Sequence, residues 1–151
     1  MSHTTTVASI QITSISALRM ALGVLAQEGI RAELIEDAVP RAYFRNQQGM
    51  GRADYVIKLH DCPYDIGLYK KKEGGYEART DLWANEVSRL LGVPGNTPQH
   101  AMGKLYNRYA VAAIQEQAEE QGFDYETAMQ ADGTVIITVQ DTSSGASAGA
   151  I

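Results

Sequence analysis

The chain has 151 residues, of which 44% are hydrophobic and 21% are charged, and its formal net charge at pH 7 is −5. This size and composition are typical of one globular domain with a substantial hydrophobic core. A negative chain is a poor match for sequence-independent nucleic-acid binding, which relies on many Lys and Arg side chains to neutralise phosphates. Its one cysteine excludes an internal disulfide and a cysteine-rich metal site. We find no signal-peptide pattern and no apolar run of about 18 residues, so we expect a cytoplasmic protein.

A strand and a helix open the chain. Residues 5–12 alternate β-branched and small side chains and predict a strand. Apolar residues then recur at helical spacing, which predicts a helix over residues 16–28. Ser16 supplies its N-cap, and Gly29 lies where a helix commonly turns left-handed after its last residue.

Short strands and a loop follow this helix. Residues 30–36 predict a strand that cannot continue past Pro40, and residues 43–44 add another short strand. Residues 45–52 are polar and bear glycines, so we expect a mobile loop there.

The middle of the chain predicts a three-stranded antiparallel meander. Residues 53–60 alternate apolar and polar side chains with period two, and Pro63 ends this run because proline supplies no donor to a strand ladder. Residues 64–70 form the returning strand. Residues 72–75 supply the second turn through their glycines, and residues 76–80 form the third strand.

Two helices are predicted after the meander. Asp81 is placed to cap a helix that Gly92 ends. Thr97 followed by Pro98 is a start signal for a second, long helix, which Gly122 ends.

The C-terminal segment predicts a hairpin. Residues 123–130 and 134–140 form its strands around Asp132-Gly133, a dipeptide typical of hairpin turns. Residues 143–151 form a tail too poor in apolar bulk to order itself. The element order predicts one α+β domain over residues 1–142, with a mainly antiparallel sheet and helices packed on one face as a two-layer sandwich.

Few residues combine in a pattern typical of catalysis. A two-residue turn at Cys62-Pro63 would place His60 opposite Asp65, either as a general acid–base pair or as an ordinary cross-strand pair on a solvated face. Cys62 has no second base nearby in the sequence and is interpreted as a bystander thiol. The three histidines lack metal-ligand spacing, so we predict no metal site and no cofactor.

Positive charge gathers around Arg41, Arg45, Arg52 and residues 70–72. These residues either recruit an anionic ligand or acidic partner, or protect a strand edge from unwanted pairing. A phosphate loop is not indicated, since a strand rather than a helix follows Gly51.

The chain has eight tyrosines, four of them in the predicted meander. They serve either as a contact surface or in core packing, because tyrosine combines a large apolar ring with a polar tip.

Several short motifs recur in an order that resembles a known family. They are Met1-Ser2-His3, Tyr64-Asp65-Ile66-Gly67, Gly75-Tyr76-Glu77 with Asp81-Leu82-Trp83, Asn107-Arg108-Tyr109-Ala110, Gln121-Gly122-Phe123 and Asp132-Gly133. Together they resemble the hypothetical chloroplast reading frame thirty-five family, small proteins of cyanobacteria and algal plastids with relatives in other bacteria and in phages. The resemblance covers nearly the whole chain up to the tail, and residues 93–99 depart from it.

The resemblance implies an accessory role and supplies no catalytic residue. Genes of this family often lie near a gene for an AAA-type ATPase, which implies such an ATPase as a partner. It also implies the plastid stroma for algal relatives and the host cytoplasm for a phage-encoded member. The candidate binding residues are the motif positions, joined by one residue of the cationic cluster: His3, Arg52, Asp65, Asp81, Trp83, Asn107 and Arg108.

We expect Arg108 to lie beside Asp65 or Asp81. There it either forms a buried ion pair that fixes the helix to the sheet, or it supplies half of an anion pocket.

Two functions fit these observations. The first is a non-enzymatic accessory or protein-interaction protein that is oligomeric and uses the tyrosine-rich meander as its contact surface. The second is a binder of a small anionic, nucleotide-like ligand, in a chain that a phage can encode. Its binding residues would be Arg41, Arg45, Arg52, Lys70 and Arg108. An enzyme that uses His60 and Asp65 is the third hypothesis.

Overall fold

The computed structural model describes residues 4–42, 51–96, 98–129 and 135–140. Its strands are β1 (Thr4–Ile12), β2 (Ala32–Ala38), β3 (Ala53–Leu59), β4 (Ile66–Lys70), β5 (Tyr76–Asp81), β6 (Asp124–Met129) and β7 (Val135–Gln140). Its helices are α1 (Ile15–Gln27), the 3₁₀ helix η1 (Trp83–Asn85), α2 (Glu86–Leu91), α3 (Pro98–Ala101) and α4 (Gly103–Gln121).

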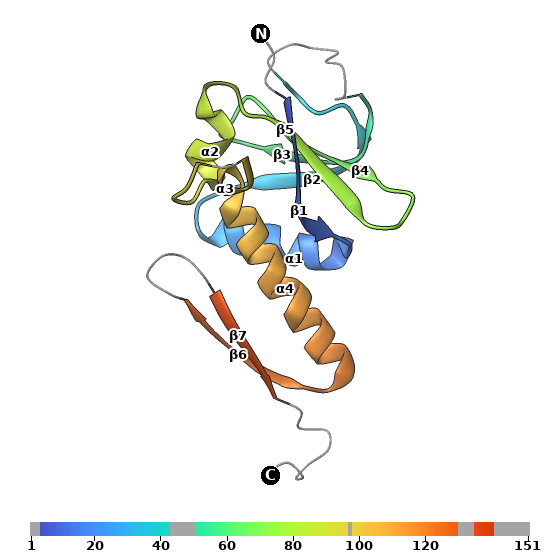
Figure 1. Ribbon diagram of the computed structural model, residues 1–151, viewed down its shortest axis with the longest axis vertical. Helices are drawn as coiled ribbons and strands as arrows, with labels where there is room; N and C mark the ends of the chain where they lie inside the picture. The colour runs from blue at the N-terminus through green and yellow to red at the C-terminus, as the bar shows by residue number, and fades with distance from the viewer. Residues whose placement is uncertain (1–3, 43–50, 97, 130–134, 141–151) are drawn as a thin grey trace.

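Five strands form one antiparallel sheet in the order β1-β5-β4-β3-β2. The predicted meander of three consecutive strands is therefore confirmed as β3–β4–β5. Helices α1 and α4 cover one face of this sheet (Figure 1), where Ile57, Leu59, Ile66 and Leu68 meet the apolar sides of both helices in a single core. The α+β prediction with helices on one face is confirmed.

Helices α1 and α4 are joined by polar contacts at both ends of α1. At its start, the Tyr109 hydroxyl accepts hydrogen bonds from the backbone N–H groups of Thr13 and Ser14, at 2.8 and 3.0 Å. Glu116 accepts bonds there from the hydroxyls of Ser14 and Ser16, which lowers the pKa of its carboxyl. A carboxylate at this place also suits the positive end of the α1 dipole.

At the end of α1, Arg108 Nε and Nη2 bind the Glu28 carboxylate at 2.8 and 3.0 Å. The predicted contact of Arg108 with Asp65 or Asp81 is wrong, because this arginine joins two helices rather than helix and sheet.

Two predicted helix boundaries differ from the structure. Ser14, not Ser16, caps α1 and accepts from Ala17 N–H at 3.0 Å. The long helix expected from Thr97 is interrupted at Met102, a buried residue with φ −119° and ψ 24°. The propensity pattern does not foresee this break because it follows tertiary packing.

The helix expected directly after Asp81 begins later, at Glu86. Asp81 ends β5 and is fully buried, and its Oδ1 accepts from Trp83 N–H at 2.9 Å. Ala84 and Asn85 then adopt left-handed backbone angles, with φ 59° and 57°, before α2 starts.

The hairpin β6–β7 forms a separate two-stranded sheet beside the C-terminal half of α4 (Figure 1). Gly122 has φ 75°, and Phe123 N–H donates to Ala118 O at 2.7 Å. The left-handed glycine and this hydrogen bond end α4 and direct the chain back along it. The predicted turn Asp132-Gly133, the strand at residues 43–44, most of the loop at 45–52 and the tail at 143–151 lie outside the described residues.

We expect two alanine substitutions in and after α1 to change stability in opposite directions. Gly29 has φ 92°, so Gly29→Ala should lower the free energy of unfolding by about 1 kcal/mol. Gly23 lies on the exposed side of α1, where an added methyl group would meet no neighbouring atom, so Gly23→Ala should raise that free energy by about 0.5–1 kcal/mol. Urea unfolding of both variants measures this, and equal shifts would contradict the assigned end of α1.

Candidate functional site

Arg41 holds the loop between β3 and β4. Its Nη2 donates to Asp65 Oδ1 at 2.7 Å and to the carbonyl oxygens of Leu59 and Cys62 at 2.8 and 3.0 Å. Its Nε and its backbone N–H also bind the Asp65 carboxylate. Asp65 is 3% exposed, and its hydrogen bonds raise the pKa of Arg41. One arginine therefore fixes both strand ends and the loop that connects them.

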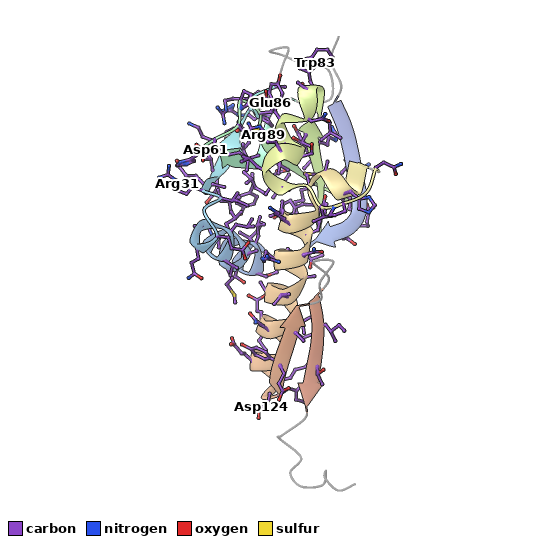
Figure 2. All side chains as sticks on the ribbon, turned by 90° about the vertical axis from the view of Figure 1, so that its left-hand side faces the viewer. Arg31, Asp61, Trp83, Glu86, Arg89 and Asp124 are labelled. Atoms are coloured by element: carbon purple, nitrogen blue, oxygen red, sulfur yellow. The ribbon has the colours of Figure 1, made fainter. Side chains whose placement is uncertain are left out.

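A charged hollow of about 310 Å³ lies beside this loop, at the ends of β2 and β3. It is lined by Arg31, Glu33, Arg41, Lys58, Leu59, His60 and Asp61. Figure 2 shows Arg31 and Asp61 near each other on this side of the molecule, with Glu86 and Arg89 of α2 next to them. We call this site the charged hollow.

His60 and Glu33 form an ion pair or hydrogen bond across two strands of the charged hollow, with 2.8 Å between Nε2 and Oε2. The strand register places Glu33 opposite Lys58, yet the carboxylate binds His60 instead. Neither Lys58 nor Arg31 has an ion-pair partner within the described residues. The hollow therefore presents two cations that can meet a ligand.

The predicted pairing of His60 with Asp65 is wrong. Strands β3 and β4 pair Ile57 with Ile66, whereas a two-residue turn at Cys62-Pro63 would have required Leu68 at that place. The loop is longer than expected, since β3 ends at Leu59 and β4 begins at Ile66, and the last residue of this loop, Asp65, binds Arg41. The acid–base pair considered from the sequence does not exist.

Cys62 lies in the same loop and is 4% exposed. Burial raises the pKa of its thiol, although the charges of Arg89 and Arg41 act in the opposite direction. A raised pKa keeps the thiol protonated at neutral pH, and the thiolate is the reactive form. The prediction of a bystander thiol agrees with this environment.

A second hollow, of about 500 Å³, lies between α2 and α3. Its lining is mostly uncharged: Leu82, Asn85, Ser88, Gly92, Val93, Gly95, Asn96, His100 and Ala101. Its amide, hydroxyl and imidazole groups can form hydrogen bonds but supply no fixed charge.

The residues predicted as a binding set are dispersed. Arg52 pairs with Asp37 at 2.9 Å in an exposed position, while Asp65 pairs with Arg41 and Arg108 with Glu28. Each of these three predicted residues therefore has its partner outside the predicted set.

Among the other predicted residues, Asp81 and Trp83 do contact each other, through the hydrogen bond at the start of η1. Asn107 lies half-buried on α4, and His3 lies outside the described residues.

Sequence reasoning missed Arg31, Glu33 and Lys58. The available signal was a spacing of two, between Arg31 and Glu33 and between Lys58 and His60, which places the residues of each pair on one sheet face. Within the described residues, no group of three or more His, Cys, Asp or Glu side chains could hold a metal ion.

The tyrosines of the meander lie beside or within the core. Tyr55 and Tyr76 pack edge to face at 5.6 Å beside the core, and the Arg79 guanidinium covers Tyr69 at 4.6 Å. Every tyrosine whose side chain is described is buried or half-buried. Core packing, the alternative left open, is their main role.

The family model for DUF1257, described as a protein of unknown function, matches residues 20–138. The chain belongs to the DUF1257 family. The matched segment extends from α1 into β7, so the DUF1257 region includes strands β2 to β5 of the large sheet, the charged hollow and most of the hairpin, whereas β1 lies before it. No curated protein and no solved structure matches the chain. Within the described residues, none of the helices of this DUF1257 member has both the length and the apolar content needed to cross a bilayer.

We expect Arg41→Ala to lower the free energy of unfolding by about 2 kcal/mol, because it removes the side-chain donors of two carbonyls and of the Asp65 carboxylate, which keeps only the backbone N–H of residue 41. Arg52→Ala is the matched control. It breaks a pair whose side chains are 61% and 76% exposed, so it should change stability by less than about 0.5 kcal/mol. Urea unfolding of both variants measures the difference. Equal losses would show that Arg41 does not hold the loop.

Proposed function

We propose that this chain is a non-enzymatic accessory protein of the cytoplasm that acts through protein–protein contact. The contact is made by the arm, which we define as the C-terminal half of α4 and the β6–β7 hairpin (residues 114–129 and 135–140). This assignment replaces the meander as the expected contact surface.

The observation that supports the proposal is the open hairpin of the arm. A two-stranded sheet is marginally stable by itself, and this one rests on α4 (Figure 1). No described strand pairs with the outer edge of β6 or of β7. Unpaired edges bind further strands through their backbone groups. Ile136, on the exposed face of the hairpin, is 51% exposed and supplies apolar area for such a contact.

The proposal includes a narrower family assignment within DUF1257. The motif order resembles the hypothetical chloroplast reading frame thirty-five family, whose genes often lie near one for an AAA-type ATPase. An AAA-type ATPase is therefore the first partner to test.

We expect Ile136→Lys to reduce at least several-fold the amount of protein that the tagged chain retains from its source cells, with an AAA-type ATPase among the proteins measured. A charge on the hairpin face removes apolar contact and opposes strand addition. Val39→Lys is the matched control, because Val39 is 49% exposed but lies in the sheet region. Quantitative mass spectrometry of the retained proteins compares the variants. Equal retention by both would count against the arm.

A second candidate function is binding of a small anionic, nucleotide-like ligand in the charged hollow. Arg31 and Lys58 support it, since both line the hollow without an ion-pair partner among the described residues. Asp61 lines the same space and repels an anion. A bound ligand must therefore place its negative charge toward Arg31 and Lys58. Of the cations named from the sequence, Arg41 lines the hollow, whereas Arg52 and Arg108 are paired elsewhere.

We expect a phosphate-bearing ligand to raise thermal stability, by about 2.7 kcal/mol at 100 times its dissociation constant. Lys58→Ala should abolish this rise because it removes a free cation from the hollow. Lys72→Ala, on the exposed turn between β4 and β5, should leave it unchanged. A thermal-shift screen with inorganic phosphate and nucleotides measures the effect. No rise with any of them, or an equal rise in Lys58→Ala, would remove support for this candidate.

A further inference from the structure

The outer strands of the two sheets differ in how they are protected from pairing. Strand β2 carries Glu33, Glu36 and Asp37, and strand β6 carries Asp124 and Glu126. Charges on an outer strand oppose the addition of another strand. Both of these edges are therefore poor templates for pairing.

Strand β1 has no charged residue but is protected in another way. Its pairing with β5 changes register between Val7 and Ile12, and such irregularities disfavour further pairing. Helix α3 also packs against β1.

Strand β7 has neither form of protection. Its six residues, Val-Ile-Ile-Thr-Val-Gln, contain no charge, no proline and no glycine, and five of them are β-branched. Its ladder with β6 is regular over all six pairs. A regular, uncharged and β-branched outer strand is the most favourable template for strand addition.

We propose that β7 pairs antiparallel with β7 of a second copy of this chain, forming a four-stranded sheet in the order β6-β7-β7-β6. The inference deepens the proposed function by naming the occupant of the arm, and it rests on that function. Antiparallel pairing of one strand with itself is two-fold symmetric, so it closes after two copies and leaves no new β7 edge.

The charge distribution favours a second copy over a different partner. A partner of another sequence is selected by complementary charges or pockets, and β7 offers no charged side chain for such selection. Two chains of net charge −5 repel each other over most of their surface. Pairing through β7 brings uncharged strands together and leaves Asp124 and Glu126 of β6 at the two outside edges.

The stability of the small sheet points in the same direction. Two strands alone are marginal, whereas four strands with an apolar face supported by helices are an ordinary sheet. Each β-branched residue of β7 would also gain a cross-strand neighbour from the second copy.

The test combines sedimentation over a range of concentrations with amide hydrogen exchange of the full chain. We expect a monomer–dimer equilibrium. We further expect the β7 amides that do not bond β6 to become protected as dimer forms, while the outward amides of β6 stay unprotected. Protection confined to β7 identifies the edge itself, independently of any substitution.

Two lysine variants at a cross-strand pair sharpen the test. Ala128 and Ile136 are direct partners on the exposed face of the hairpin. Ile136→Lys places like charges at the seam and should raise the dimer dissociation constant by at least about tenfold. Ala128→Lys, one strand farther from the seam, should change it much less. Amide protection within the hairpin verifies that both variants keep β6 and β7 paired.

A chain that is monomeric at all concentrations, or a dimer whose outward β7 amides remain unprotected, would overturn the inference. Partner retention that is lost in Ile136→Lys while the chain is monomeric would leave the proposed function standing with a different occupant of the arm. If the dimer forms through β7 but Ile136→Lys leaves the retention of other proteins unchanged, the inference stands and the proposed function is contradicted.

Discussion

The structure depends on the pairing of α1 with α4 over one face of the sheet. Tyr109 and Glu116 hold the start of α1, and Arg108 holds its end through Glu28. The N-terminal half of α4 lies in the core, with Leu105 and Tyr106 fully enclosed, and its C-terminal half supports the hairpin. The contacts that fix α4 on the sheet therefore also set the position of the arm.

Features of the fold set by local chemistry could be predicted from the sequence. Alternation over β3 identified the meander, because a strand with one buried face must place apolar residues at every second position. Gly29 and Gly122 marked helix ends, because left-handed backbone angles there favour glycine. These signals involve residues close together in the chain, and each agrees with the tertiary structure.

Features set by distant contacts could not be predicted in this way. The register of β3 and β4 depends on Arg41, which lies 24 residues before Asp65 and binds three separate groups of the loop. The break at Met102 falls at a buried residue of the core, and helix propensity does not mark this position. Of the two left-handed residues before α2, Asn85 is of a type that tolerates positive φ, whereas Ala84 follows no residue preference, since alanine at positive φ is disfavoured.

The same distinction explains why the charged hollow was only partly foreseen. Its cations come from two strands far apart in sequence, and the carboxylate of Glu33 pairs with His60 rather than with the lysine directly opposite. Sequence patterns can place residues on a face, but they do not decide which acid binds which base. Several of the motif positions, such as Asp65 and Arg108, make contacts that hold the fold together.

The polar groups around the β3–β4 loop make contacts within the protein. The Arg41 guanidinium is already engaged by a buried carboxylate and two carbonyl oxygens, so its charge is largely neutralised. The Cys62 thiol is buried with a raised pKa, which makes it a poor nucleophile. The His60 imidazole contacts the Glu33 carboxylate at 2.8 Å, in an exposed position. The loop is therefore held by its own polar contacts, and it presents neutralised or protonated groups beside the charged hollow.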